Sequence, residues 1–80
     1  MIMNPIKNKT YEISTEEFGE ESGTVVDPTI FVHAASEPVA GSVIRIPKLK
    51  GQACKVLIVA GRRRGQTVPV LLTDFRESRA

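Results

Sequence analysis

From residue 23 onward, apolar residues fall in short runs that are each bounded by glycine or proline. The runs are rich in valine and isoleucine, and the glycines and prolines recur at intervals shorter than an average helix. Strands are therefore expected in preference to helices. The pattern predicts four or five short antiparallel strands, drawn from the segments 23–27, 29–35, 41–47, 53–60 and 67–75.

The last two runs, 53–60 and 67–75, predict a C-terminal hairpin because only the short loop GRRRGQ separates them. Val56–Ala60 is apolar at consecutive positions, which is typical of a strand covered on both faces. Pro69 predicts that its strand lies at an edge of the sheet or begins near there, because proline donates no hydrogen bond to a ladder. An apolar edge strand of this kind favours pairing with another copy of the chain.

Residues 1–22 have a different pattern, with few apolar positions and the carboxylate-rich segment STEEFGEES. Crowded carboxylates repel each other in a compact state, so we expect an acidic N-terminal arm that is flexible or loosely docked. Two local alternatives stay open within it. Ser14 and Glu17 fit a capping box that starts one helical turn, whereas the alternation of Tyr11 and Ile13 with polar residues fits an edge strand.

Chain length limits the architecture to one domain, because 80 residues bury barely enough surface for a single core. We expect an all-β domain over residues 23–80, built as a small barrel or sandwich and preceded by the arm. In strand number and loop spacing it resembles small barrels of the SH3-like and OB kind, and this resemblance of architecture implies no function. A core this small also favours self-association.

Charge divides the chain into two halves of opposite sign. Residues 1–40 carry two lysines and seven carboxylates, whereas residues 41–80 carry nine lysines and arginines and two carboxylates. The densest positive charge is the loop with Arg62, Arg63 and Arg64. Guanidinium groups bind phosphate and carboxylate through charge-assisted hydrogen bonds. The loop therefore predicts a site for an anionic partner, which is nucleic acid or an acidic protein surface, flanked by Lys48, Lys50 and Lys55.

Nucleic-acid binding by this loop would rest on phosphate contacts, because two usual elements of base recognition are missing from the sequence. No aromatic residue for base stacking lies between Phe31 and Phe75, and no base-reading helix is predicted. The simpler alternative is a solvated hairpin tip that keeps the protein soluble.

Catalysis is not expected, since the chain has one cysteine, Cys54, and one histidine, His33, and most of its carboxylates gather in the arm. These residues form no disulfide and no four-ligand metal site within one chain, and no cofactor is implied. The loop 61–67 lacks the Gly-Lys-Ser/Thr ending of a phosphate-binding loop, and a strand-like run follows it. The expected function is that of a non-enzymatic binding protein.

The alternative function is a protein–protein interaction module, an inhibitor or structural (virion-type) protein that forms a homo-oligomer through its β edges. Its docking element would be the arm, through the carboxylates Glu16, Glu17, Glu20 and Glu21. Such an arm can also occupy a basic patch as a phosphate mimic, in the same molecule or on a partner. No apolar run has the length of a membrane span and the first residues lack the apolar region of a signal peptide, so a cytoplasmic or virion protein is expected.

Overall fold

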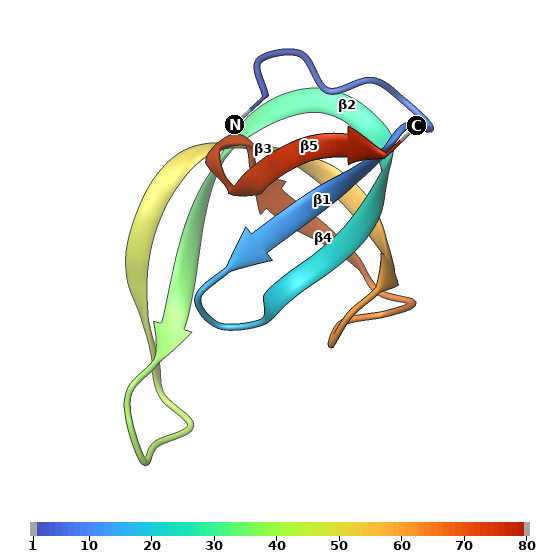
Figure 1. Cartoon of the computed structure of the whole chain (residues 1–80). Coiled ribbons are helices and arrows are strands. Elements are labelled where there is room, and N and C mark those ends of the chain that lie inside the picture. The colour runs from blue at the N-terminus through green and yellow to red at the C-terminus, as the bar shows by residue number, and fades with distance from the viewer. Residues whose placement is uncertain (1, 80) are drawn as a thin grey trace.

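The chain forms one antiparallel β-sheet in a computed structural model that describes residues 2–79, apart from the side chains of residues 35, 37, 47–49 and 77–79. The sheet order is β4-β3-β2-β1-β5 (Figure 1), so the mostly antiparallel β prediction is confirmed. In the described part of the chain β4 and β5 are not paired with each other, and the sheet is not closed. Its elements are β1 (Thr10–Thr15), β2 (Gly19–Pro38), β3 (Arg45–Ala60), β4 (Thr67–Leu71), the one-turn 3-10 helix η1 (Leu72–Asp74) and β5 (Phe75–Arg79).

Two long strands, β2 and β3, form the centre of the sheet and bend strongly (Figure 1). The predicted strands 23–27 and 29–35 are both parts of β2. Pro28 separates them without ending the strand, because it falls where the β2–β3 register is interrupted, between Asp27 and Phe31. Pro47 likewise lies inside β3, opposite Ser36 and next to a second register shift. Proline is tolerated at such irregular positions because no ladder donor is lost there.

The core lies on the inner side of the bent sheet. Phe75 is fully buried, and its ring meets the edge of the Tyr11 ring at a centroid distance of 5.2 Å. Side chains on β3 alternate, since Val56 and Ile58 are buried whereas Val59 is 41% exposed. The prediction that Val56–Ala60 is covered on both faces is therefore wrong for the single chain. The buried cluster comprises Tyr11, Ile13, Val25, Cys54, Val56, Ile58, Val70, Leu72 and Phe75.

The N-terminal residues do not form the predicted arm, because residues 10–15 are β1 and residues 19–22 begin β2. A three-residue loop joins the two strands, with Gly19 in the left-handed region at φ 69°. The Phe18 N–H donates to Thr15 Oγ1 at 3.0 Å, which fixes the turn. Of the two local alternatives the strand is the correct one, although β1 lies inside the sheet between β2 and β5.

The C-terminal hairpin forms as predicted, with β3 and β4 antiparallel and β4 at an edge of the sheet. The predicted strand 67–75 ends earlier, at Leu71, where η1 turns the chain toward the opposite edge. β5 then pairs with β1. In the described residues no helix has the length and apolar character needed to cross a membrane.

Candidate functional site

The three consecutive arginines of the β3–β4 loop have different environments, and the middle one is turned inward. The Arg63 guanidinium binds the Glu21 carboxylate, with Nη2 to Oε1 at 2.7 Å and Nε to Oε1 at 3.1 Å. The Arg63 backbone N–H donates to Glu21 Oε2 at 3.0 Å. The Glu21 side chain is 0% exposed and that of Arg63 is 14% exposed. A buried carboxylate is tolerated here because the pair satisfies its hydrogen bonds.

Strand register brings Glu21 and Arg63 together across the sequence. Ser22 of β2 pairs with Ala60 of β3, so the loop begins directly beside Glu21. A Cβ on Gly61 would lie 2.5 Å from Glu21 Cγ, which shows how closely the loop backbone passes this side chain. The Arg63 guanidinium also lies over the Phe18 ring, 4.1 Å from its centroid.

A second ion pair joins the β1–β2 turn to the start of β3. Arg45 Nη1 and Nη2 donate to the two carboxylate oxygens of Glu17 at 3.1 and 2.8 Å. Arg45 also donates to the Ser36 hydroxyl and carbonyl oxygens. The hydrogen bond from Arg45 lowers the pKa of Glu17, and the same bond raises the pKa of Arg45. Unlike the Glu21 pair, this pair is partly exposed, at 45% for Arg45 and 29% for Glu17.

The other basic candidates do not gather into one patch. Arg62 is exposed and its Nη1 donates to the Glu17 carbonyl oxygen at 3.3 Å, while Arg64 is exposed at the loop tip. Lys55 is exposed in the middle of β3, opposite Asp27. The pKa of Asp27 is lowered, mainly by the hydrogen bond that its carboxylate accepts from the Thr29 N–H, and the charges of Lys55 and Lys7 lower it further. Lys50 is exposed farther along β3, and the side chain of Lys48 lies outside the described residues.

The acidic candidates are divided in the same way. Glu21 is buried and Glu17 is half-buried, and both face arginines of this chain. Glu16 and Glu20 are exposed. The structure thus pairs two of the predicted docking carboxylates with the basic half of the same molecule, which sequence reasoning had raised as one role for the acidic segment.

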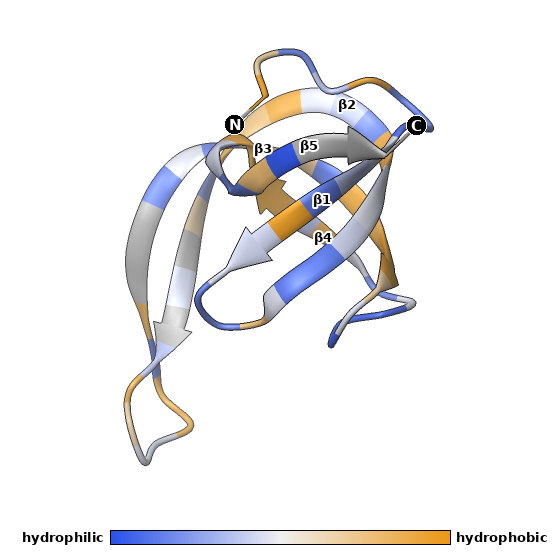
Figure 2. Cartoon of the chain, in the orientation of Figure 1, coloured by the Kyte–Doolittle hydropathy of each residue, from blue (hydrophilic) through white to orange (hydrophobic). Residues whose placement is uncertain are grey.

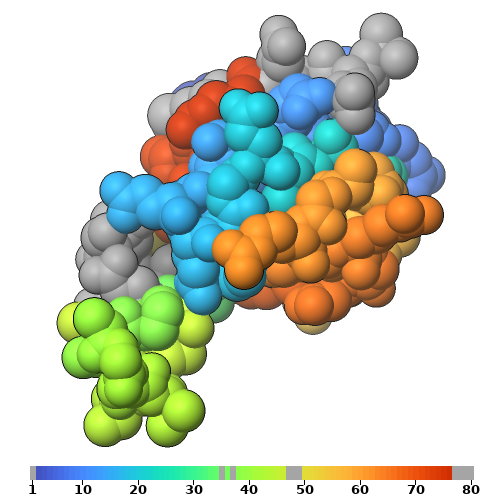
Figure 3. All heavy atoms as spheres, turned by 60° about the horizontal axis from the view of Figure 1, so that its bottom comes forward, coloured from blue at the N-terminus to red at the C-terminus, as the bar shows by residue number. Residues whose placement is uncertain are grey.

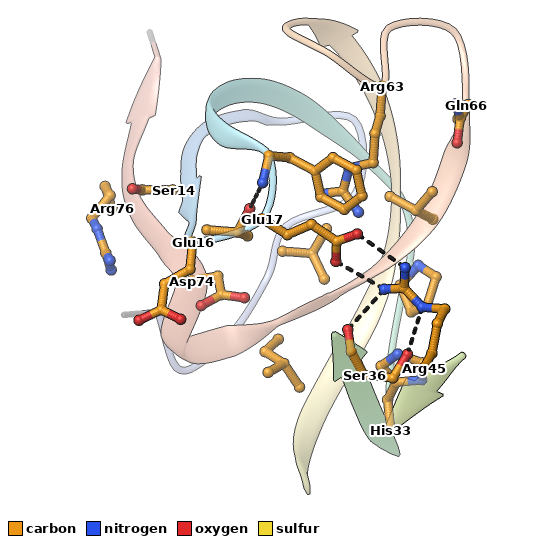
Figure 4. A pocket seen from close by; sticks show the side chains of 16 residues that line it. Ser14, Glu16, Glu17, His33, Ser36, Arg45, Arg63, Gln66, Asp74 and Arg76 are labelled. Atoms are coloured by element: carbon orange, nitrogen blue, oxygen red, sulfur yellow. Dashed lines mark hydrogen bonds and ion pairs between the residues drawn. The ribbon is translucent and has the colours of Figure 1, made fainter. Parts of the chain in front are cut away.

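A groove of about 720 Å³ opens beside these ion pairs (Figure 4). It lies between the end of β1 with the β1–β2 turn, the loop end of the β2–β3 hairpin, β4, η1 and the start of β5. Its lining residues are Ser14, Thr15, Glu16, Glu17, Phe18, His33, Ser36, Arg45, Arg63, Gln66, Val68, Pro69, Val70, Leu71, Asp74 and Arg76.

The groove has an apolar side and a charged rim. The apolar side chains come from Phe18 and from the consecutive β4 residues 68–71. Glu17 and Arg45 face each other at the rim in Figure 4, while Glu16, Asp74 and Arg76 gather at the other end. Burial raises the pKa of Asp74, and the charges of Arg76 and Arg63 oppose this shift. An apolar floor with charges of both signs suits a ligand that is itself amphipathic.

Sequence reasoning identified Arg63, Glu16 and Glu17 but missed most of the groove. Phe18 carried a signal, because an aromatic residue followed by Gly19 after a short polar segment is compatible with a tight turn that presents the ring. Arg45 and Asp74 carried none, since each reaches the groove through pairings between distant parts of the chain.

The single cysteine and the single histidine of the chain lie in different surroundings. Cys54 is buried in the core, and burial raises the pKa of its thiol to about 11. In the part of the chain that the structure describes, no three His, Cys, Asp or Glu side chains come together in an arrangement able to hold a metal ion. His33 lies at the groove wall, with its ring 6.3 Å from that of Phe31.

The function of the groove and its ion pairs is inferred from the residues that form them. Comparison with protein-family models, with curated proteins and with solved structures gives no match to this chain.

Proposed function

We propose that the chain is a small non-enzymatic binding protein whose groove takes an extended polypeptide segment of a protein partner. The observation that carries this proposal is the groove of about 720 Å³ along β4, with an apolar floor and charges at its rim. Ligand sites are commonly clefts of roughly 300–1,000 Å³ in which apolar surface is combined with a few polar groups.

The position of β4 suits an extended ligand. In the described part of the chain β4 pairs with β3 alone, so its other edge is open. Pro69 has no N–H, and a proline within a ladder faces its nitrogen away from the partner strand. Backbone pairing along this edge would therefore be interrupted at Pro69, and a polypeptide that lies along β4 would be held mainly by the apolar floor and the charges at the rim.

The rim supplies charges that a ligand can use. The Glu17–Arg45 pair is partly exposed, and ion pairs that water reaches contribute little to stability because water competes for both charges. A ligand that carries a carboxylate or an ammonium group can therefore exchange with one member of the pair at small cost. Arg63 cannot be used in this way, since Glu21 already binds its guanidinium in a buried site.

We also propose that the bent sheet is the open form of a small barrel. Helix η1 carries the chain from β4, at one edge of the sheet, to β5 at the other, which supports a barrel in preference to a sandwich. The groove lies between β4 and the β1–β2 turn in this arrangement.

Binding of an anionic partner, nucleic acid included, is the second candidate. Arg62 and Arg64 are exposed at the loop tip, and this favours contacts to phosphate. The candidate is weaker than it was from sequence alone because the central Arg63 is bound to Glu21. The proposals of a cytoplasmic or virion protein and of an acidic docking element stay predictions.

Selection from a displayed library of random peptides tests the groove. We expect the wild-type protein to enrich peptides with apolar residues next to a charge, and Phe18→Ala to lose most of this binding because it removes the aromatic wall. Val59→Ala is the matched control, since Val59 is an exposed apolar residue of β3 that does not line the groove. Circular dichroism establishes that both variants are folded.

The same proteins are then mixed at low salt with pools of single-stranded and duplex oligonucleotides. The groove would be rejected in favour of the second candidate by two results together. No peptide is enriched, and the protein binds oligonucleotides in a way that salt abolishes and that Arg62→Ala and Arg64→Ala weaken. Equal loss of peptide binding in Phe18→Ala and Val59→Ala would also reject it.

A further inference from the structure

The ends of β2 and β3 that lie nearest their connecting loop extend beyond the rest of the sheet. β1 pairs with β2 only as far as Thr24, and β4 pairs with β3 only over Ala53–Leu57. Beyond these limits the two strands form a two-stranded ribbon, residues 32–38 with 45–52, that projects from the body (Figures 1 and 3). Within the described residues no other strand pairs with the outer edges of this ribbon, although the Ser36 carbonyl oxygen accepts a hydrogen bond from Arg45. We call it the projecting ribbon.

The two edges of the projecting ribbon differ in sequence. The β3 edge contains Arg45, Pro47, Lys48 and Lys50. Natural proteins protect exposed edges with lysine and proline, because lysine resists burial and proline interrupts pairing. The β2 edge contains no Asp, Glu, Lys, Arg or Pro over residues 29–36, and Glu37 and Pro38 follow only at its loop end. Residues 29–32, TIFV, favour strand formation. One edge of the ribbon is thus protected and the other is open to pairing.

From this difference we propose that a second copy of this chain pairs its β2 with β2 of the first, antiparallel and across a two-fold axis, along residues 29–36. The two sheets then become one continuous sheet, and Val32, which is 71% exposed in the single chain, is covered near the centre of the interface. A two-fold axis closes the assembly at a dimer, because each copy uses the same edge.

Charge supports a second copy as the occupant and β2 as the edge. Pairing β2 with β2 brings together two uncharged segments. Pairing β3 with β3 would instead set the lysines of one copy beside those of the other, and like charges facing each other across strands are destabilising.

The distribution of exposed apolar side chains also fits this arrangement. Figure 2 shows apolar residues at the tip of the projecting ribbon, where Val43 and Ile44 are 98% and 65% exposed. Antiparallel pairing places each tip next to the partner's residues near Val26, which is itself 36% exposed. Ile6, 54% exposed, lies close to this point because the Asn8 N–H donates to the Val25 carbonyl oxygen. The same axis therefore covers apolar surface at both ends of the pairing.

Sedimentation equilibrium over a range of protein concentrations tests the dimer. We expect the wild-type mass to rise to twice that of the chain, and Val32→Lys to remain at the single-chain mass because two lysines would meet near the axis. Gln52→Lys is the matched control. Gln52 is exposed and pairs directly with Val32. The variant Gln52→Lys therefore adds the same charge to the same ribbon, but on its β3 edge. It is expected to dimerise like the wild type.

Each other outcome overturns the proposal. A wild-type protein that keeps the single-chain mass at every concentration has no dimer. The dimer would form through a different surface if Gln52→Lys alone loses it, if both variants lose it, or if neither does. Val32 is exposed and lies off the groove, so circular dichroism should show a folded variant and peptide binding should be unaffected. His33 and Ser36 of the same segment line the groove, so peptide binding by Val32→Lys shows whether the groove functions without the dimer.

Discussion

Replacement of Arg63 by alanine is expected to lower the free energy of unfolding by about 3 kcal/mol, because it leaves the Glu21 carboxylate buried without its counter-ion. Glu21 is 0% exposed and accepts hydrogen bonds from Nε and Nη2 of Arg63. The substitution also removes the cation–π contact with Phe18. Urea denaturation followed by circular dichroism measures the change.

The neighbouring arginines provide the controls. Arg62→Ala and Arg64→Ala remove the same charge from exposed positions of the same loop, and each is expected to change the unfolding free energy by no more than about 0.5 kcal/mol. Three equal effects would contradict the inward role of Arg63, since a merely solubilising arginine cluster makes no distinction among its members.

Gly61→Ala is expected to lower the free energy of unfolding by about 3 kcal/mol, through a strained backbone and a steric clash. Gly61 has φ 116°, a conformation that side chains other than glycine rarely adopt. A Cβ there would also lie 2.5 Å from Glu21 Cγ and 3.1 Å from its Cα, so the carboxylate that binds Arg63 would be displaced. Thermal unfolding detects this loss as a lower Tm.

Gly65→Ala separates the two causes. Gly65 also has a positive φ, of 89°, but an added Cβ would meet nothing within 4 Å. Its expected cost is therefore the backbone strain alone, about 1 kcal/mol. If Gly61→Ala is no more destabilising than Gly65→Ala, the close packing of the loop on Glu21 is contradicted.

The strands with apolar runs could be predicted from the sequence, and the acidic start of β2 could not. Local pattern is enough to predict the second half of β3, from its apolar run, and the edge position of β4, from Pro69. The carboxylates around Glu21 repel one another, so the sequence there predicts a tail. Arg63 neutralises Glu21, and this partner lies far along the chain, where a single sequence gives no indication of the pairing.

The same limit applies to the candidate site. Charge density identified the arginine loop, but which arginine faces inward depends on the register of Ser22 with Ala60. The groove depends on the bend of the sheet, which brings Phe18, Arg45 and Asp74 from three separate elements to one place. Opposite charge on the two halves of the chain, by contrast, was visible from the start, and the structure uses part of it for intramolecular ion pairs.

The most direct test of the groove as the binding site is the measurement of intermolecular nuclear Overhauser effects between the wild-type protein and a peptide selected from the library. We expect contacts from the peptide to the Phe18 ring and to the methyl groups of Val68 and Leu71, which line the groove. Contacts confined to Arg62 and Arg64 at the loop tip, with no effect at these groove residues, would contradict the proposal.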